Sequence, residues 1–362
     1  MSSKISQWKW EDKLATDSVS CSPFCEQVVY HEIKRKADEC RQVEWQFSKH
    51  QKALTGHVIK TIDKPSESAC ETECYLEANC VSINFNELYL ECQLNNATDE
   101  SRAASLMDVP GWRYKPIMDQ CVVNDCPVRK SFCQSGFGGL HSYRCFCSKC
   151  FSGARCEKGN FTVQFPRKLH EYHLRHPTKI NLGSAFTAAA WLKTSALSGS
   201  WVQTIFSFAK HDSYNALFVY IMPASISIVM DNNERISDIP APLMDDRWHH
   251  VTFTWIRGIW ELYIDGVSKQ NGRSLAESST FSDVIAIFGQ DQDSYGGGFT
   301  LNQCFVGSLS GVNVWSRVLN WEEIAKIFGG CNTMDGDAVQ WGDLYPWDNM
   351  GEMEIDCPAL CL

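Results

Sequence analysis

A glycine-flanked loop with two acids carries the most specific chemistry in this chain. Residues 289–297 read GQDQDSYGG, with Asp291 and Asp293 two positions apart. In an extended loop, side chains two positions apart face the same side. Ca²⁺ takes about six to eight hard oxygen ligands in flexible geometry, so paired carboxylates beside glycines suit it. On spacing alone, a solvated surface turn is the simpler alternative.

The remaining acids and histidines do not form a catalytic pattern. His249 and His250 open an expected strand, where alternation places one of them in the core or at an edge. The E-x-D spacing of jelly-roll glycosidases occurs only at residues 354–356, and Ala359 replaces the final acid of that pattern. No G-x-S-x-G or H-E-x-x-H motif is present. We therefore expect a binding protein and not an enzyme.

Cysteine usage indicates an oxidising compartment. The chain has 18 cysteines, and most of them lie before residue 158. That concentration is typical of small disulfide-stapled modules followed by a domain with its own core. Zinc knuckles would need paired C-x-x-C motifs, and one such spacing occurs, between Cys147 and Cys150. The sequence therefore predicts disulfides and an extracellular or secreted protein.

Charge and hydropathy limit the classes of partner that the chain could bind. The 362 residues carry a formal net charge of −10, which argues against a nucleic-acid binder. No stretch is long and apolar enough to span a membrane. The first 29 residues contain no apolar leader, so we expect that the signal peptide is missing from this chain.

Residues 158–335 have the pattern of a large antiparallel β-sandwich. Short apolar runs such as FTVQF, ALFVYIM and HHVTFTW are separated by turn signals at Asp265-Gly266 and Asn271-Gly272. One helix is marked by Asn320 as N-cap, Glu323 as the second half of a capping box, and glycines at 329–330. The fold class expected for the whole chain is mostly β.

This domain resembles the pentraxin family. The resemblance lies in the run GQDQDSYGGGF, in Gln303, in VGSLSGVNVW and VLNWEEI, and in HVTFTW at residues 250–255. It implies a jelly roll of the concanavalin and laminin-G type with calcium bound at one face. In that family the calcium receives phosphorylated or carbohydrate ligands.

The resemblance also implies a ligand set. Asp291 and Asp293 would bind Ca²⁺ through carboxylates and Gln292 through its backbone carbonyl. Gln303 would reach an outer ion, and Asn215 matches the asparagine of the family's Asp-Asn pair.

This chain has fewer acidic ligand residues than the family pattern. Tyr214 replaces the aspartate of the Asp-Asn pair, Thr300 replaces an acid, and Asp291 stands for a glutamate. Asp212 is a candidate replacement for the lost carboxylate. Because fewer charges weaken binding, we expect one ion with a dissociation constant of about 10⁻⁴–10⁻³ M.

The family's signature disulfide is absent. Its two positions are Ala189 and Thr252, so packing must hold the sheets together. The expected core aromatic residues are Phe186, Trp191, Phe253 and Trp255. A bridge between Cys304 and Cys331, at a place where laminin-G-like domains carry one, is expected to tie the last strand to the segment after the helix.

Residues 41–118 resemble a PAN/apple module of α+β type. Ser68 and Glu71 form a possible capping box, and the helix that follows carries Cys70 and Cys74 on one side. Pairs Cys70–Cys92 and Cys74–Cys80 would staple this helix to a sheet.

Residues 119–157 resemble an EGF-like domain through the C-x-C at Cys145 and Cys147. The resemblance implies the pairs Cys121–Cys133, Cys126–Cys145 and Cys147–Cys156, although sequence alone leaves 15 possible pairings. Cys150 is a seventh cysteine, whose partner is open among Cys21, Cys25, Cys40 and another chain.

Two terminal segments remain, residues 1–40 without assignment and residues 336–362 as a tail carrying Cys357 and Cys361. Glycosylation sequons occur at Asn96 and Asn160.

The sequence thus predicts a calcium-dependent, pattern-recognition or lectin-like binding protein. A homo-oligomer linked by cysteines or by non-covalent contacts is compatible with the sequence. The alternative is a matrix or adhesion protein that uses a laminin-G-like sandwich as a metal-independent protein-binding surface.

Overall fold

The computed structural model describes residues 41–195, 202–331, 333–346, 353–359 and 361. Their contacts form two compact units, one of residues up to 124 with 134–144, and one of residues 125–133 with 145–362. The segment 1–40, with Cys21, Cys25 and Cys40, lies outside the described residues. Among the residues described, no helix combines the length and hydropathy needed to cross a membrane.

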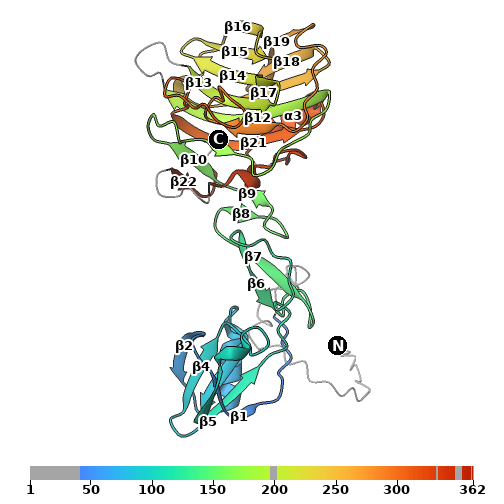
Figure 1. Cartoon of the computed structure of the whole chain (residues 1–362). Helices are drawn as coiled ribbons and strands as arrows, with labels where there is room; N and C mark the ends of the chain where they lie inside the picture. The colour runs from blue at the N-terminus through green and yellow to red at the C-terminus, as the bar shows by residue number, and fades with distance from the viewer. Residues whose placement is uncertain (1–40, 196–201, 332, 347–352, 360, 362) are drawn as a thin grey trace, which may run out of the picture. The chain divides into compact units, whose positions relative to one another are not determined.

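In its described residues, the first unit contains a five-stranded antiparallel sheet and the helix α2 (Figure 1). The strand order is β1-β5-β3-β4-β2, and the central strand β3 is buried along its whole length. The elements are β1 (Lys49–Leu54), β2 (Val58–Asp63), α2 (Glu67–Leu76), β3 (Ser82–Asn86), β4 (Glu91–Asn95), the 3₁₀ turn η3 (Ala103–Ser105) and β5 (Leu106–Pro116).

Two disulfides fasten helix α2 to this sheet. Cys70 bonds to Cys92 in β4, and Cys74 bonds to Cys80 just before β3, which are the two pairs expected from the sequence. The cap of the helix differs from the prediction. Ser66 is the N-cap and accepts a hydrogen bond from the Ala69 amide, so the helix already includes Ser68.

The cysteine-rich segment 119–157 contains the two-stranded sheet of β6 (Ser131–Ser135) and β7 (Tyr143–Cys147). It also contains β8 (Phe151–Ser152), which pairs with β9 (Lys158–Gly159) just after the segment. The structure contains the bonds Cys126–Cys145 and Cys147–Cys156. The pairing of Cys121 with Cys133 stays a prediction, although each is disulfide-bonded. Cys150 bonds to Cys357, so it is not the link to another chain considered above.

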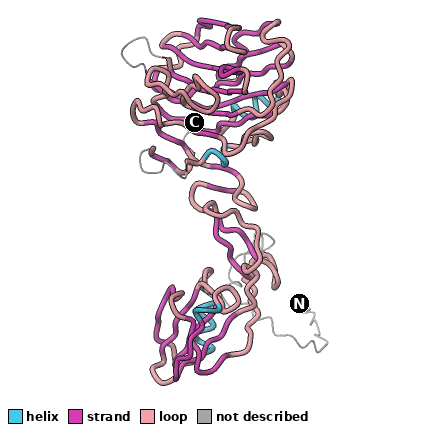
Figure 2. The backbone as a smooth tube through the Cα atoms, viewed as in Figure 1, coloured by secondary structure: helices cyan, strands magenta, loops and turns pink. Residues whose placement is uncertain are grey.

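The second unit contains a sandwich of two antiparallel sheets, drawn in magenta and joined by pink loops in Figure 2. One sheet has the order β19-β18-β17-β12-β21-β10-β22, and the other has the order β11-β20-β13-β14-β15-β16. The strands are β10 (Thr162–Phe165), β11 (Leu174–Arg175), β12 (Ala185–Ser195), β13 (Gln203–Lys210), β14 (Ser213–Met222), β15 (Ser225–Met230), β16 (Glu234–Pro240), β17 (Asp245–Ile256), β18 (Ile259–Ile264), β19 (Val267–Gly272), β20 (Ile285–Phe288), β21 (Gly307–Trp315) and β22 (Glu354–Asp356).

Aromatic side chains fill the space between the sheets. Phe186, Phe253 and Trp255 are fully buried there, and burial of each contributes roughly 2–3 kcal/mol. Trp191, the fourth expected core residue, is also buried, but on the other face of β12, where it stacks on Phe328. The reason is alternation, because its neighbours Ala190 and Leu192 face the core.

Helix α3 (Trp321–Phe328) covers part of the outer face of the seven-stranded sheet. Ile324 and Ile327 pack against Ala189 and Trp315 on β12 and β21. The capping box predicted at its start is present: Asn320 accepts from the Glu323 amide, and the Glu323 carboxylate accepts from the Asn320 amide.

Replacing Asn320 with alanine is expected to lower the free energy of unfolding by about 1 kcal/mol, because one helix-end amide loses its acceptor. Urea denaturation followed by circular dichroism measures this loss. Asn320→Asp keeps a side-chain oxygen that can accept from the Glu323 amide and is the control. Equal losses in the two variants would show that the cap is not the cause.

The segment after residue 335, read above as a tail, also packs on the sandwich. Strand β22 pairs with β10, and the 3₁₀ turn η4 (Trp341–Leu344) buries Trp341 against Phe161. The Trp341 indole donates a hydrogen bond to the Phe161 carbonyl at 2.9 Å.

The predicted Cys304–Cys331 bridge is wrong, since Cys331 bonds to Cys361. Cys331 lies against Gly311, in the middle of β21, whereas Cys304 precedes that strand. Gly307 and Gly311 are four positions apart in the strand, which is about 13 Å at the usual rise. A disulfide needs its two Cα atoms within about 7 Å.

Candidate metal centre

The acidic loop begins where β20 ends and folds back over the outer face of its own sheet. Gly289 has a φ of 83° at this reversal, a conformation that favours glycine. Asp291 and Gln292 are fully buried, whereas Asp293 is exposed. The Gln292 side chain holds the loop in place, because its amide donates to the carbonyls of Ser207 and Ile285 and accepts from the Gly296 amide.

Ser207 is the residue around which the buried part of the loop is organised. Its neighbours Phe206 and Phe208 face the core, so alternation places Ser207 on the outer face of β13. The Ser207 hydroxyl donates to Asp291 Oδ1 at 2.9 Å and accepts from the Gln292 amide at 3.0 Å. Sequence reasoning did not select Ser207, although its position between two core phenylalanines marks it as facing outward.

Asp291 is a buried acid whose hydrogen-bond donors are neutral. Gln303 Nε2 donates to Asp291 Oδ2 at 2.8 Å, and Ser207 donates to the other oxygen. In the described residues no cationic side chain pairs with it. Burial raises the pKa of Asp291 to about 6, the bond from Ser207 opposes this rise, and the charge of Asp293 adds to it. The buried part of the loop therefore contains an acid without a matching cation among the described residues.

Gln303 and Thr300 complete the rim next to Asp291. The Thr300 hydroxyl donates to Gln303 Oε1 at 2.5 Å, and the Gln303 carbonyl accepts from the Thr204 hydroxyl at 2.6 Å. Three of the predicted ligand residues, Asp291, Gln292 and Gln303, are thus joined in one hydrogen-bonded group around Ser207.

Asn215 reaches the same outer face through an irregularity in β14. Ala216 and Leu217 are consecutive and both face the core, and the register of β13 with β14 shifts between Phe208 and Lys210. This break in alternation leaves Asn215 on the outer side. Its Oδ1 is buried and has no hydrogen-bond partner in the described structure. A buried acceptor without a partner costs about 1–3 kcal/mol unless something binds to it.

Asp212, the candidate replacement carboxylate, is directed elsewhere. Its oxygen lies 3.8 Å from Lys210 Nζ, and its side chain is largely exposed. Lys210 in turn pairs with Asp231 at 3.0 Å. Among the described residues no group of three or more histidine, cysteine or acidic side chains could hold a metal, so a cation here would depend on amide and carbonyl oxygens beside two carboxylates.

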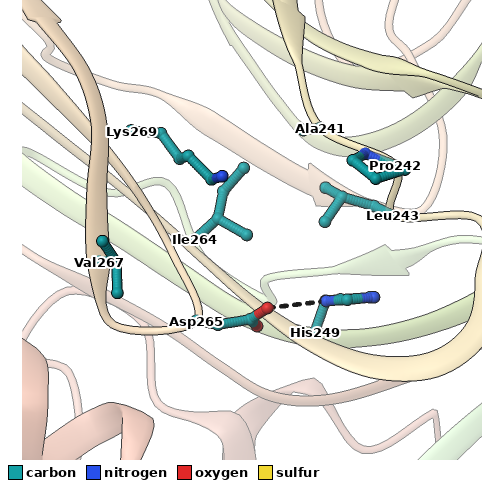
Figure 3. Close-up of a pocket in the computed structure, with 8 residues that line it drawn as sticks. All are labelled: Ala241, Pro242, Leu243, His249, Ile264, Asp265, Val267 and Lys269. Atoms are coloured by element: carbon teal, nitrogen blue, oxygen red, sulfur yellow. Dashed lines mark hydrogen bonds and ion pairs between the residues drawn. The ribbon is translucent and has the colours of Figure 1, made fainter.

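A separate cavity of about 360 Å³ lies beside His249, lined by the eight residues drawn in Figure 3. His249 bridges two acids, with Nδ1 at 2.9 Å from Asp265 and Nε2 at 3.0 Å from Asp245. Burial by itself would lower the pKa of His249, but the hydrogen bonds and charges of the two carboxylates outweigh this effect, so the pKa is raised above its ordinary value. His250, by contrast, is buried between Trp191 and Phe328, as alternation predicted for one of the pair.

The two sequon asparagines differ in surroundings. Asn96 is exposed just after β4. Asn160 is half-buried, and its Oδ1 accepts from the Ala359 amide at 3.1 Å. Glycosylation at both positions stays a prediction.

Comparison with known proteins identifies two regions of the chain. The Pentaxin family model matches residues 162–355, and the PAN domain model matches residues 25–114. Neuronal pentraxin-1 of Rattus norvegicus is 32% identical over 188 residues, 51% of this chain and 43% of the relative. Neuronal pentraxin-2 of Mus musculus is 36% identical over 162 residues, 44% of this chain and 37% of the relative.

A solved heptameric SAP-like pentraxin from Limulus polyphemus aligns with 56% of this chain and 97% of its own, at 19% identity and a TM-score of 0.47. The chain spans less than half the length of the curated relatives it matches. The Pentaxin model, however, covers more than half of the 362 residues. The protein therefore belongs to the pentaxin family.

Proposed function

We propose that this protein binds Ca²⁺ at the outer face of the six-stranded sheet and captures anionic or carbohydrate ligands there. The observation that carries this proposal is Asp291, a fully buried acid that accepts hydrogen bonds from two neutral donors and lies near the charge of Asp293. A buried carboxylate normally has a cationic partner or a metal. A divalent cation would supply the missing charge.

Five residues would hold the ion. Asp291 and Asp293 would contribute carboxylate oxygens, Gln292 its carbonyl, and Asn215 its buried, unpaired Oδ1. Gln303 would turn its amide so that Oε1, in place of Nε2, faces Asp291. When bound, Ca²⁺ supplies a positive centre with coordination positions that ligand oxygens complete. Ser207 would keep Asp291 oriented whether or not the ion is present.

Two carboxylates favour modest affinity. Ligand charge count tunes calcium binding, and extracellular modules commonly have dissociation constants of about 10⁻⁴–10⁻³ M. We propose one ion in that range, because Thr300 is neutral and Asp212 pairs with Lys210. Extracellular calcium is abundant enough to fill such a site, and an extracellular location also suits the disulfides, which involve fourteen of the described cysteines.

Isothermal titration with Ca²⁺ at neutral pH tests the proposal. Wild-type protein is expected to release or absorb measurable heat with one site, and Asp293→Ala to bind about tenfold more weakly, because an exposed carboxylate is partly screened. Asp108→Ala, which removes an exposed acid from the first unit, is the matched control. Titrations without heat in wild-type protein would reject calcium binding and favour the metal-independent protein-binding surface.

The assembly of the chain is a further part of the proposal. Cys150, Cys331, Cys357 and Cys361 form bonds within the chain, so they do not support the disulfide-linked oligomer considered from the sequence. We propose that any homo-oligomer forms through non-covalent contacts of the sandwich. Sedimentation in the presence and absence of reducing agent distinguishes the two.

A further inference from the structure

A second cavity, of about 280 Å³, lies on the seven-stranded sheet and has a different character from the calcium pocket. Polar side chains from adjacent strands line it, together with one tryptophan, Trp248. All of its lining residues belong to the second unit. The residues that the argument uses are Gln164, Lys193, Asp246, Trp248, Ser308 and Asp356.

Four of these residues form one row across the sheet. Gln164 on β10 is in register with Ser308 on β21, Ser308 with Lys193 on β12, and Lys193 with Trp248 on β17. These strands are neighbours in the order β17-β12-β21-β10, and Figure 1 shows β10, β21 and β12 along the lower part of the sandwich. With strands about 4.8 Å apart, the row extends for roughly 14 Å.

The row faces away from the core. Val163, Phe165, Leu192 and Leu309, which flank its members in sequence, all belong to the core between the sheets. Alternation therefore places Gln164, Lys193 and Ser308 on the outer face. Helix α3 covers a different part of this face, since it packs on Ala189 and Trp315.

The row offers hydrogen-bonding groups that the protein itself uses little. Gln164 Nε2 donates to Asp356 at 2.5 Å, while its Oε1 has no partner in the part of the chain that the structure describes. The Ser308 hydroxyl and the Trp248 indole N–H likewise have none among the described residues, and neither atom is sealed from solvent. Lys193 Nζ lies 3.7 Å from Asp246, with both side chains substantially exposed.

The charges select against anions. One ammonium, on Lys193, is offset by the carboxylates of Asp246 and Asp356, so the site has a small negative balance. Amide, hydroxyl and carboxylate groups beside a flat aromatic face are the groups that recognise sugar hydroxyls and the apolar face of a pyranose ring.

We propose that this row binds a short neutral oligosaccharide without calcium. One ring stacks on Trp248, and hydroxyl groups of the following rings bond to Lys193, Ser308 and Gln164 along the row. The acidic loop with Asp291 lies on the outer face of the other sheet, so the two sites occupy opposite faces of the sandwich. This site is therefore independent of the calcium site proposed above.

The test is a panel of immobilised oligosaccharides built from hexose and N-acetylhexosamine units, each in neutral and in sulfated form, probed with the full chain in EDTA. We expect at least one oligosaccharide to bind, and Trp248→Ala to bind it at least about tenfold more weakly, the loss typical of truncating an aromatic anchor. Trp248→Phe keeps a ring and should retain most of the affinity. Asp293→Ala should have wild-type affinity, which separates this site from the calcium pocket.

Trp321→Ala is the matched control, because Trp321 is 72% exposed on α3 and is not part of the row. Thermal melts verify that each variant is folded, and Ser308→Met, which fills the middle of the row without touching Trp248, provides a second test. Absence of binding to every oligosaccharide in EDTA would overturn the proposal. So would unchanged binding in both Trp248→Ala and Ser308→Met, or binding to sulfated oligosaccharides alone.

Discussion

Asp291→Asn is expected to weaken calcium binding by at least about 100-fold while leaving the fold intact. Unit charges about 4 Å apart at an effective dielectric constant near 20 interact by about 4 kcal/mol, and each tenfold change in affinity corresponds to about 1.4 kcal/mol. Asparagine has the same shape and still offers one oxygen to Ser207 or Gln303. The loss would thus report charge and not packing.

The same substitution should stabilise the calcium-free protein. Burial raises the pKa of Asp291 to about 6 from 3.8, so the folded state holds a proton that the unfolded state has already released. Stability then falls as pH rises from about 4 to about 6, and the ionised acid costs about 3 kcal/mol at higher pH. Asparagine carries no charge, so this pH dependence should disappear in the variant.

Asp291→Asn is thus expected to weaken calcium binding and to stabilise the calcium-free protein. This combination identifies a metal ligand. Denaturant unfolding in EDTA, repeated across this pH range, measures the stability, and calcium titration measures the affinity. Calcium competes with the proton on Asp291, so wild-type affinity should also fall below about pH 6. A variant that is less stable than wild type in EDTA at neutral pH, or that binds calcium normally, would assign Asp291 a structural role.

Local patterns were sufficient for much of the fold. The capping box at Asn320 and Glu323 depends on residues three positions apart, and the structure contains it. The Cys70–Cys92 and Cys74–Cys80 bonds connect a helix face to the strands that follow it directly. Such features can be predicted from the local sequence, because the spacing between the residues decides which groups can meet.

Long-range placement was harder to predict. Trp191 was expected in the core and is buried there, but both faces of β12 are buried, and composition cannot tell which aromatic residue faces which layer. Cys331 bonds to Cys361 because the path after α3 crosses the middle of β21, which no local spacing reveals. Asn215 faces outward only because β14 is irregular at Ala216 and Leu217. Ser207 could not be selected from the sequence, because it contacts Asp291 only through the fold of the acidic loop.

Arg41 is a residue whose importance the sequence did not indicate at all. It is 5% exposed, and its guanidinium donates to the backbone carbonyls of Cys74, Glu77 and Cys80 at the end of α2 and to that of Ser135. All of these residues belong to the first unit. Burial lowers the pKa of Arg41 to about 10, so the side chain stays charged at neutral pH.

Arg41→Met is expected to destabilise the first unit by about 4 kcal/mol. Methionine fills similar apolar space but removes the guanidinium donor from four carbonyls, of which that of Glu77 still accepts from the Cys80 amide. Hydrogen bonds to a charged group are worth about 1.5–3 kcal/mol each before relaxation and water entry reduce the sum. For a unit of this size, such a loss lowers the melting temperature by at least about 15 °C. Calorimetry measures the shift.

Hydrogen exchange locates the effect within the unit. Amides at Glu77 and Cys80, which bond to Glu73 and Glu77 carbonyls, should exchange faster in Arg41→Met than in wild type. Arg102→Met is the control, because the Arg102 side chain is exposed and, among the described residues, bonds only to the carbonyl of its neighbour Ser101. Equal melting temperatures and exchange rates in the two variants would mean that water replaces the guanidinium without cost, and that the two disulfides of α2 suffice to hold the end of the helix.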